Sequence, residues 1–236
     1  MRIFAISDLH LSFGSNKPMH VFGGNWQNYL EKIKTNWQNQ VHENDIVLIA
    51  GDISWAMKLE QTVEDFKFLN SLKGRKIIIR GNHDYWWSSI SAVRNALPEN
   101  IFAIQNDAIK FNNYIICGTR GWTVPEKEFE SEQDKKIFQR EVIRLDLTLQ
   151  SAVKLRKGNE EIICMIHYPP FNSRREVNDF TKLFDKYNVD KVVFGHLHGK
   201  KIKSSLIFNF NKRKYFLTSC DLVNNNLVLI ADDEKP

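Results

Sequence analysis

The chain has 236 residues, of which 42% are hydrophobic and 26% charged, a composition typical of a globular domain and unlike that of disordered or fibrous chains. Charged, Asn or Gly residues interrupt every apolar run before it could cross a bilayer, and a strand-like run begins so early that it leaves no room for a signal peptide. We therefore expect a single domain over residues 1–236, no membrane contact and a cytoplasmic location. The net charge of +5 favours the approach of a phosphorylated molecule but does not establish nucleic-acid binding.

Apolar runs alternate with helical periodicity along the first two-thirds of the chain. We predict, in chain order, strand 2–6, helix 25–40, strand 45–49, helix 59–72, strand 76–80, helix 87–97, short strands 101–104, 108–111 and 113–117, helix 131–156, strand 161–166, helix 177–187 and strand 191–194. Strands that alternate with helices indicate an α/β fold with parallel strands. Residues 204–232 alternate strand-like runs with polar turns, which predicts an antiparallel meander. No linker or repeat divides the chain.

The three cysteines are widely spaced and form no CxxC pair. Cys117 and Cys164 lie in apolar runs without an adjacent basic residue that would stabilise a thiolate. We expect Cys117, Cys164 and Cys220 to be reduced thiols without a chemical role.

Five short polar blocks each follow an apolar run that predicts a buried strand. They are Asp8-Leu9-His10, Gly51-Asp52, Gly81-Asn82-His83-Asp84, His167 and Gly195-His196-Leu197-His198. Open α/β sheets place their ligands at the carboxyl ends of strands, and five of the seven histidines fall inside these blocks. Helix capping could explain single Asp or Asn residues there, but it explains none of the histidines. The pattern therefore indicates a metal site.

Seven of these side chains are candidate ligands: Asp8, His10, Asp52, Asn82, His167, His196 and His198. Carboxylate, imidazole and amide donors suit Mn, Fe or Zn, and the lack of cysteine ligands argues against a structural zinc site. Seven ligands are too many for one ion but suit two ions that share a carboxylate. Such a pair, roughly 3.5–4 Å apart, can hold a hydroxide nucleophile and clamp the oxygens of a phosphoryl group.

The blocks D-x-H, GD, GNHD, H and GHxH, in this order from Asp8 to His198, resemble those of the calcineurin-like metallophosphoesterases, among them compact bacterial-type phosphohydrolases. The resemblance implies a four-layer αββα sandwich of two mixed β-sheets flanked by helices. The predicted order of elements is compatible with this sandwich but does not by itself lead to it.

The resemblance also implies roles for single residues. It assigns Asp8, His10 and His198 to one metal ion, and Asn82, His167 and His196 to the other, with Asp52 as the bridge. His83 would face the scissile bond as a general acid or phosphate-stabilising group. Asp84 would orient the His83 imidazole.

Two long loops leave strand ends and are expected at the rim of the site, residues 11–25, which could form a lid, and residues 119–130. Arg120, Arg174 and Arg175 are candidates for phosphate binding, and Trp122 for stacking on a nucleobase. Ordinary surface roles remain open for all four. The basic residues of the C-terminal part, Lys200, Lys201, Lys203, Lys212, Arg213 and Lys214, are expected to form a solvated hairpin rather than a binding groove.

We therefore expect a metal-dependent phosphoesterase with two divalent or trivalent ions. Its substrate is expected to be a small phosphodiester, for example one derived from a nucleotide, attacked by a metal-bridging hydroxide without a covalent protein intermediate. Phosphomonoesterase and nuclease activities use the same core. A non-catalytic scaffold or binding protein of this fold is the alternative from another class, although such a protein would be expected to lack several of the histidines. The oligomeric state is left open.

Overall fold

The first sheet carries the N-terminal half of the candidate site. The computed structural model describes residues 1–199 and 205–233, so Lys200, Lys201 and Lys203 of the basic group lie outside the described residues. The strand order is β11 (Val228–Asp232), β1 (Arg2–Ile6), β2 (Ile46–Ile49), β3 (Arg75–Ile78) and β4 (Ile101–Ala103). Strands β1 to β4 are parallel, and β11 runs antiparallel to β1.

The second sheet carries the C-terminal half. Its order is β5 (Ala108–Phe111), β6 (Tyr114–Thr119), β7 (Glu161–Ile166), β8 (Lys191–Phe194), β10 (Arg213–Leu217) and β9 (Ile207–Phe210). The four inner strands are parallel, and the edge strands β5 and β9 are antiparallel to their neighbours. The inner strands have their carboxyl ends at the same edge, as do β1 to β3 in the first sheet.

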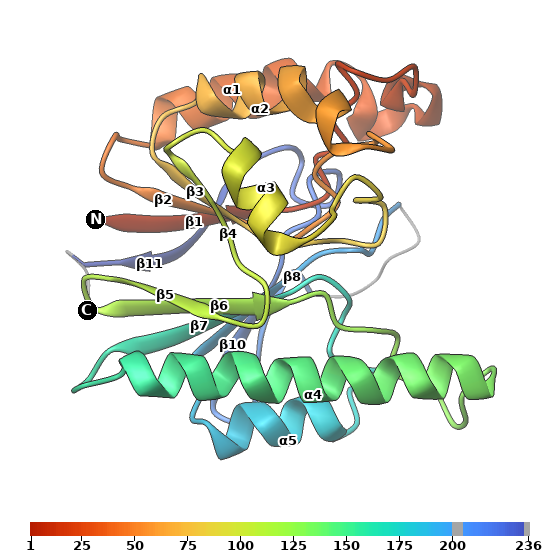
Figure 1. Cartoon of the computed structure of the whole chain (residues 1–236), viewed down its shortest axis with the longest axis vertical. Coiled ribbons are helices and arrows are strands. Elements are labelled where there is room, and N and C mark those ends of the chain that lie inside the picture. Colours follow the sequence, from red (N-terminus) through yellow and green to blue (C-terminus); the bar gives the residue numbers. More distant parts are fainter. Residues whose placement is uncertain (200–204, 234–236) are drawn as a thin grey trace.

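Helices cover the outer face of each sheet (Figure 1). Helices α1 (Tyr29–Gln40), α2 (Val63–Asn70) and α3 (Ile90–Ala96) lie over the first sheet, and α4 (Glu132–Leu155) and α5 (Asp179–Lys186) over the second. The side chain of Ser131 accepts a hydrogen bond from the Asp134 amide and caps α4, and Asn178 caps α5 in the same way.

Three apolar cores separate the layers. Side chains alternate along β1, so Phe4 and Ile6 pack beneath the helices of the first sheet while Ile3 and Ala5 face the second sheet. A third core fills the space between the second sheet and α4 and α5. Each sheet thus has two apolar faces, and the four-layer αββα sandwich of two mixed sheets is confirmed.

Most predicted elements are present with shifted ends. The helix expected at 25–40 begins at Tyr29, because residues 19–26 form two short 3-10 turns and Asn28 has a left-handed φ of 53°. The helix expected at 59–72 divides into a 3-10 turn, Leu59–Thr62, and α2.

The antiparallel meander predicted for residues 204–232 is wrong in its pairing. Strand β10 pairs antiparallel with β9 but parallel with β8, and β11 leaves this sheet to pair with β1. A bridge between Ser7 and Ser219 and a hydrogen bond from the Cys220 amide to the Ser7 carbonyl (3.0 Å) mark the crossing. The local pattern specifies strands, whereas the partner depends on which sheet edge is available.

The three cysteines are buried and free, as expected. Among the helices of the described residues, none combines the length and the apolar character needed to cross a membrane.

Candidate metal centre

The carboxyl ends of strands from both sheets converge on one cluster of polar side chains. Asp8 follows β1 and Asp52 follows β2, while His167 follows β7 and His196 follows β8. The Ser7 amide donates to the Thr218 carbonyl at 2.8 Å, which joins the ends of β1 and β10 beside the cluster. The two sheets therefore each supply part of one site.

The structure brings the seven candidate ligands into two adjoining groups. In the first, ligand atoms of Asp8, His10 and His198 lie within 4.8 Å of one another, and in the second those of Asp8, Asp52 and His167 do so. Asp52 Oδ2 lies 3.8 Å from His10 Nε2 and 3.5 Å from His167 Nε2. Asp52 thus stands between the groups, and Asp8 belongs to both.

Asn82 and His196 extend the second group. Asn82 Oδ1 lies 2.7 Å from His167 Nε2 and 2.9 Å from His196 Nδ1. The His196 amide donates to both carboxylate oxygens of Asp8, at 3.1 and 3.0 Å, so the loop after β8 is tied to the loop after β1.

The donor set fits a cation. His167 Nδ1 lies 2.9 Å from the Ala50 carbonyl, which only a protonated Nδ1 can satisfy, so in the neutral ring the Nε2 lone pair faces Asn82 Oδ1. Two acceptors at 2.7 Å repel each other unless a proton or a metal ion lies among them. Within residues 1–199 and 205–233, His198 Nε2 is buried without a hydrogen-bond partner, and it lies 3.4 Å from Asp8 Oδ1. Oxygen and imidazole donors of this kind suit Mn, Fe or Zn.

The electrostatics of the cluster favour anionic carboxylates with two neutral imidazoles. Burial by itself would raise the pKa of Asp52, but the charge and hydrogen bond of His167 and the charge of His10 lower it overall. Burial lowers the pKa of His10 to about 4, against the attraction of Asp52 and Asp8. Burial and the charge of His167 lower the pKa of His196 to about 4 as well. Neutral imidazole is the form that binds metal ions.

The backbone at four of these residues is strained. Asp8, His10, Asp52 and His196 have φ values of 60°, 45°, 52° and 70°, in the left-handed region that side chains with a Cβ disfavour by about 1–2 kcal/mol each. Such outliers gather at functional sites, where the surrounding structure holds them. The left-handed conformation is thus found at four of the seven candidate ligands.

Glycines at two positions allow the approach of the ligand loops. A Cβ on Gly81 would lie 2.1 Å from Asp52 Oδ1, and a Cβ on Gly195 would lie 2.4 Å from Asp8 Oδ2. Neither carboxylate could keep its place if these glycines were alanine.

His83 lies beside the cluster, and its imidazole is held by ring contacts. Its ring centroid is 4.5 Å from that of Trp55 and 5.6 Å from that of His10, and its amide donates to Asp52 Oδ1 at 2.8 Å. Burial lowers its pKa, against the attraction of Asp52. The position next to the bridge candidate suits a group that contacts substrate.

The orienting role expected for Asp84 is not what the structure shows. The fully buried Asp84 carboxylate accepts hydrogen bonds from the amides of Gly81 (2.7 Å), Ile53 (2.9 Å) and Ser54 (3.1 Å) and from the Trp86 indole (3.0 Å). His83 Nδ1 has no hydrogen-bond partner in the described part of the chain. Asp84 instead ties the loop after β2 to the loop after β3, because its oxygens are taken by otherwise unpaired amides.

Part of the loop 11–25 lies at the rim, as expected. Lys17 Nζ is 4.7 Å from the Trp55 ring, and the Trp55 indole donates to Met19 Sδ at 3.2 Å. The Trp55 ring stacks on His10 with centroids 4.7 Å apart. This loop therefore forms a wall of the site, while its closure as a lid stays a prediction.

Three of the substrate-binding candidates, Trp122, Arg120 and Arg174, have different surroundings. Trp122 packs on Tyr168 with centroids 5.1 Å apart, and Tyr168 packs on His196 at 4.2 Å, so Trp122 reaches the rim through Tyr168. Arg120 donates to buried Glu141 at 3.1 Å and lies over Trp122. Arg174 is exposed, and its guanidinium donates to the Glu126 carbonyl and the Glu176 carboxylate. Contacts of Arg120 and Arg174 with substrate stay predictions.

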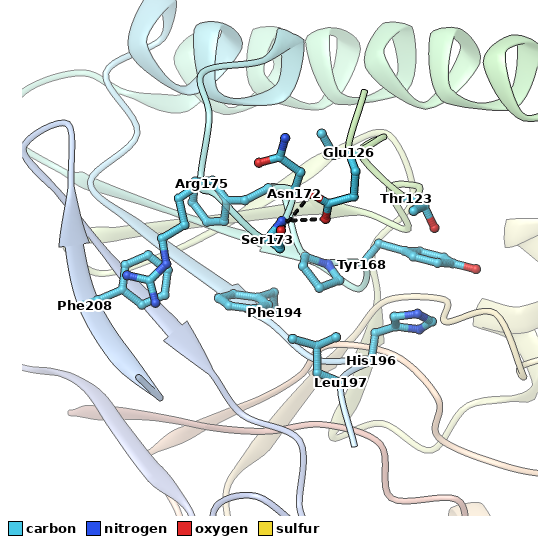
Figure 2. A pocket seen from close by; sticks show the side chains of 13 residues that line it. Thr123, Glu126, Tyr168, Asn172, Ser173, Arg175, Phe194, His196, Leu197 and Phe208 are labelled. Carbon is cyan, nitrogen blue, oxygen red and sulfur yellow. Dashed lines mark hydrogen bonds between the residues drawn. The ribbon is translucent and has the colours of Figure 1, made fainter. Parts of the chain in front are cut away.

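A pocket of about 640 Å³ opens beside His196 (Figure 2). Its lining residues are Thr123, Val124, Glu126, Tyr168, Pro169, Phe171, Asn172, Ser173, Arg175, Phe194, His196, Leu197 and Phe208. Arg175, rather than its neighbour Arg174, belongs to the wall.

Sequence reasoning missed Asp221 and Trp55. Asp221 Oδ1 lies 2.8 Å from His198 Nδ1. The Trp55 ring contacts the rings of His10 and His83 and the ammonium group of Lys17. Asp221 follows the apolar run of β10 and therefore shows the same signal as the five blocks. Nothing local distinguishes Trp55 from an ordinary core aromatic.

Comparison with known proteins agrees with this geometry. The family model described as calcineurin-like phosphoesterase matches residues 1–200. No curated protein sequence matches the chain. The solved structure of TT1561 of Thermus thermophilus is similar with a TM-score of 0.60 and 14% identity, covering 97% of this chain and 98% of that one. Phosphopantetheinyl hydrolase (PptH) from Mycobacterium tuberculosis is similar with a TM-score of 0.57 and 13% identity, covering 100% and 97%. These two likenesses concern the fold, whereas the family model covers most of the chain and includes every candidate ligand. The chain belongs to the calcineurin-like phosphoesterase family, whose members are metal-dependent hydrolases of phosphate esters.

Proposed function

We propose that this phosphoesterase hydrolyses small phosphodiesters, with Asp8, His10 and His198 holding one metal ion, Asn82, His167 and His196 the other, and Asp52 between them. When bound, two such ions activate water and neutralise charge on the phosphoryl oxygens. The chain's own residues would fix the ions in place and orient the ester.

The observation that carries the proposal is the pair of aromatic walls on either side of the ligands. On one side, the His83 ring lies against Trp55, and the half-exposed Tyr85 ring has its centroid 6.1 Å from that of His83. On the other side, the Tyr168 ring lies against His196. A diester carries two alcohol groups, and each wall offers one of them an apolar face. Aromatic faces also stack on nucleobases, which supports a nucleotide-derived substrate.

His83 is proposed to stabilise the phosphoryl group or to protonate the departing alcohol. It is half-buried next to Asp52, and no carboxylate in the described part of the chain fixes its Nδ1. A ring held only by packing can rotate to share a proton with substrate.

We also propose that the protein is cytoplasmic and that residues 1–236 form a single domain.

The test is hydrolysis of bis(p-nitrophenyl) phosphate beside p-nitrophenyl phosphate, with Mn²⁺ or with EDTA, for the wild type and Asp52→Asn. We expect preference for the diester, lost with EDTA and reduced by more than about a hundredfold in the variant. Preference for the monoester would show a phosphatase. No metal-dependent turnover of either ester would favour a binding protein of the same fold.

A further inference from the structure

We propose that the pocket beside His196 binds an uncharged apolar alcohol group of the substrate, so that the enzyme selects phosphodiesters with an alkyl or aryl ester on that side. This inference rests on the proposed function. The pocket shares His196 with the metal centre, so a phosphoryl group held there places one of its ester groups at the pocket mouth.

The floor of the pocket is apolar and fixed by packing. Phe194 and Phe171 are buried, with 2% and 8% of their surfaces exposed. The Tyr215 ring, behind the floor, lies 4.7 Å from Phe171 and stacks on Phe208 at 5.3 Å with an angle of 8°. Because these rings support one another across three strands, β8, β9 and β10, and a loop, the floor exists before substrate arrives.

The polar side chains of the rim contact one another. The Ser173 amide and hydroxyl donate to the Glu126 carboxylate at 2.8 and 2.7 Å, Asn172 donates to Glu176 at 2.6 Å, and the Arg175 guanidinium lies 3.8 Å from the centre of the Phe208 ring. Among the residues that line the pocket, Glu126 carries one negative charge and Arg175 one positive charge, so the lining does not favour one sign of charge on the occupant. Burial of apolar surface is then the main source of affinity.

The size of the pocket matches this occupant. About 640 Å³ lies within the range of sites that enclose a small organic ligand. Leu197, between His196 and His198, lines the part closest to the ligands. An ester chain that extends from a phosphoryl group near His196 would pass Leu197 and reach the aromatic floor (Figure 2).

The experiment compares methylphosphonate, butylphosphonate and phenylphosphonate as inhibitors of the Mn²⁺-loaded enzyme, with methyl p-nitrophenyl phosphate as substrate, and measures their binding by calorimetry. We expect the butyl and phenyl compounds to bind at least about tenfold more tightly than the methyl compound, because their added carbons leave water. Equal affinity of the three compounds would overturn the inference.

Variants locate the effect. Thr123→Trp adds bulk at the exposed rim and should remove most of the advantage of the butyl and phenyl compounds while leaving methylphosphonate unchanged. Phe208→Ala should weaken phenylphosphonate, whereas Ile207→Ala, a matched change of its half-exposed neighbour on β9, should not. If Thr123→Trp folds and keeps the full preference, the pocket is not the site.

The two proposals fail in different ways. Absence of Mn²⁺-dependent diester hydrolysis in the wild type contradicts the proposed function. Normal hydrolysis with no dependence on the size of the substituent contradicts only the inference about the pocket.

Discussion

The Asp221 carboxylate accepts a hydrogen bond from His198 Nδ1 at 2.8 Å, and this contact leaves His198 Nε2 facing Asp8 at 3.4 Å. Burial acts against the charge on His198, but Asp221 and Asp8 raise its pKa to about 10. Histidines that bind metal are commonly oriented by a carboxylate on the other ring nitrogen. Asp221 therefore has the place of a positioning residue for His198.

Asp221→Asn should lower metal affinity by about 10- to 100-fold, because the amide no longer stabilises the required ring orientation and basicity. Calorimetric titration with Mn²⁺ measures the effect, and excess Mn²⁺ should restore most of the turnover. Asp179→Asn, at the exposed start of α5, is the matched control. Unchanged Mn²⁺ affinity in Asp221→Asn would show that Asp221 does not position His198 for metal binding.

His83→Ala should reduce kcat for the diester by about 10²- to 10⁴-fold with little change in metal content. The imidazole contacts Trp55 and His10 rather than completing either ligand group. Turnover and metal content, measured on the same preparation of the variant, distinguish a role in the reaction from a role in metal binding. Equal loss of both would show that His83 serves the metal site instead of the substrate.

Asp84→Ala should destabilise the fold, by about 1–3 kcal/mol for each buried donor left unpaired, because the buried amides and the Trp86 indole lose their acceptor. Urea unfolding of the metal-free protein measures the loss. Asp84→Asn keeps one acceptor oxygen and should cost less. A variant as stable as the wild type but inactive would point instead to a direct role in the reaction.

Lys76 lies in β3, away from the candidate ligands. Its burial leads us to predict that the stability of the protein depends on pH in the alkaline range. It is fully buried and donates to the carbonyls of Leu72 and Gly74, and burial lowers its pKa from 10.5 to about 8. Between these two values the unfolded chain binds a proton that the folded protein does not, so this residue's contribution to stability rises with pH.

From about pH 8 to about pH 10 the gain attributable to Lys76 should be about 2 kcal/mol. Urea unfolding of the wild type and of Lys76→Met at both pH values measures how much of the change in the free energy of unfolding is due to Lys76. Lys67→Met, on the exposed face of α2, is the control. An identical pH dependence in Lys76→Met and the wild type would show that the ammonium is solvated in the folded state.

The sequence by itself identified the seven candidate ligands, because a polar block after an apolar strand is a local signal. It also located nearly every strand and helix. Apolar runs and helical periodicity depend on neighbouring residues, so the chain alone displays them. The resemblance to the calcineurin-like phosphoesterases, which also depends on short sequence blocks, predicted the four-layer sandwich.

Only the tertiary structure decided which residues meet across long distances in the chain. Asp221 reaches His198 because β10 inserts beside β8, and Asp84 bonds to the loop after β2 rather than to His83 because that loop presents unpaired amides. Arg174 and Arg175 are neighbours in the chain, yet only Arg175 lines the pocket. Strand partners, the direction of a side chain in a loop and the shape of a cavity follow from packing of distant segments, which no local pattern records.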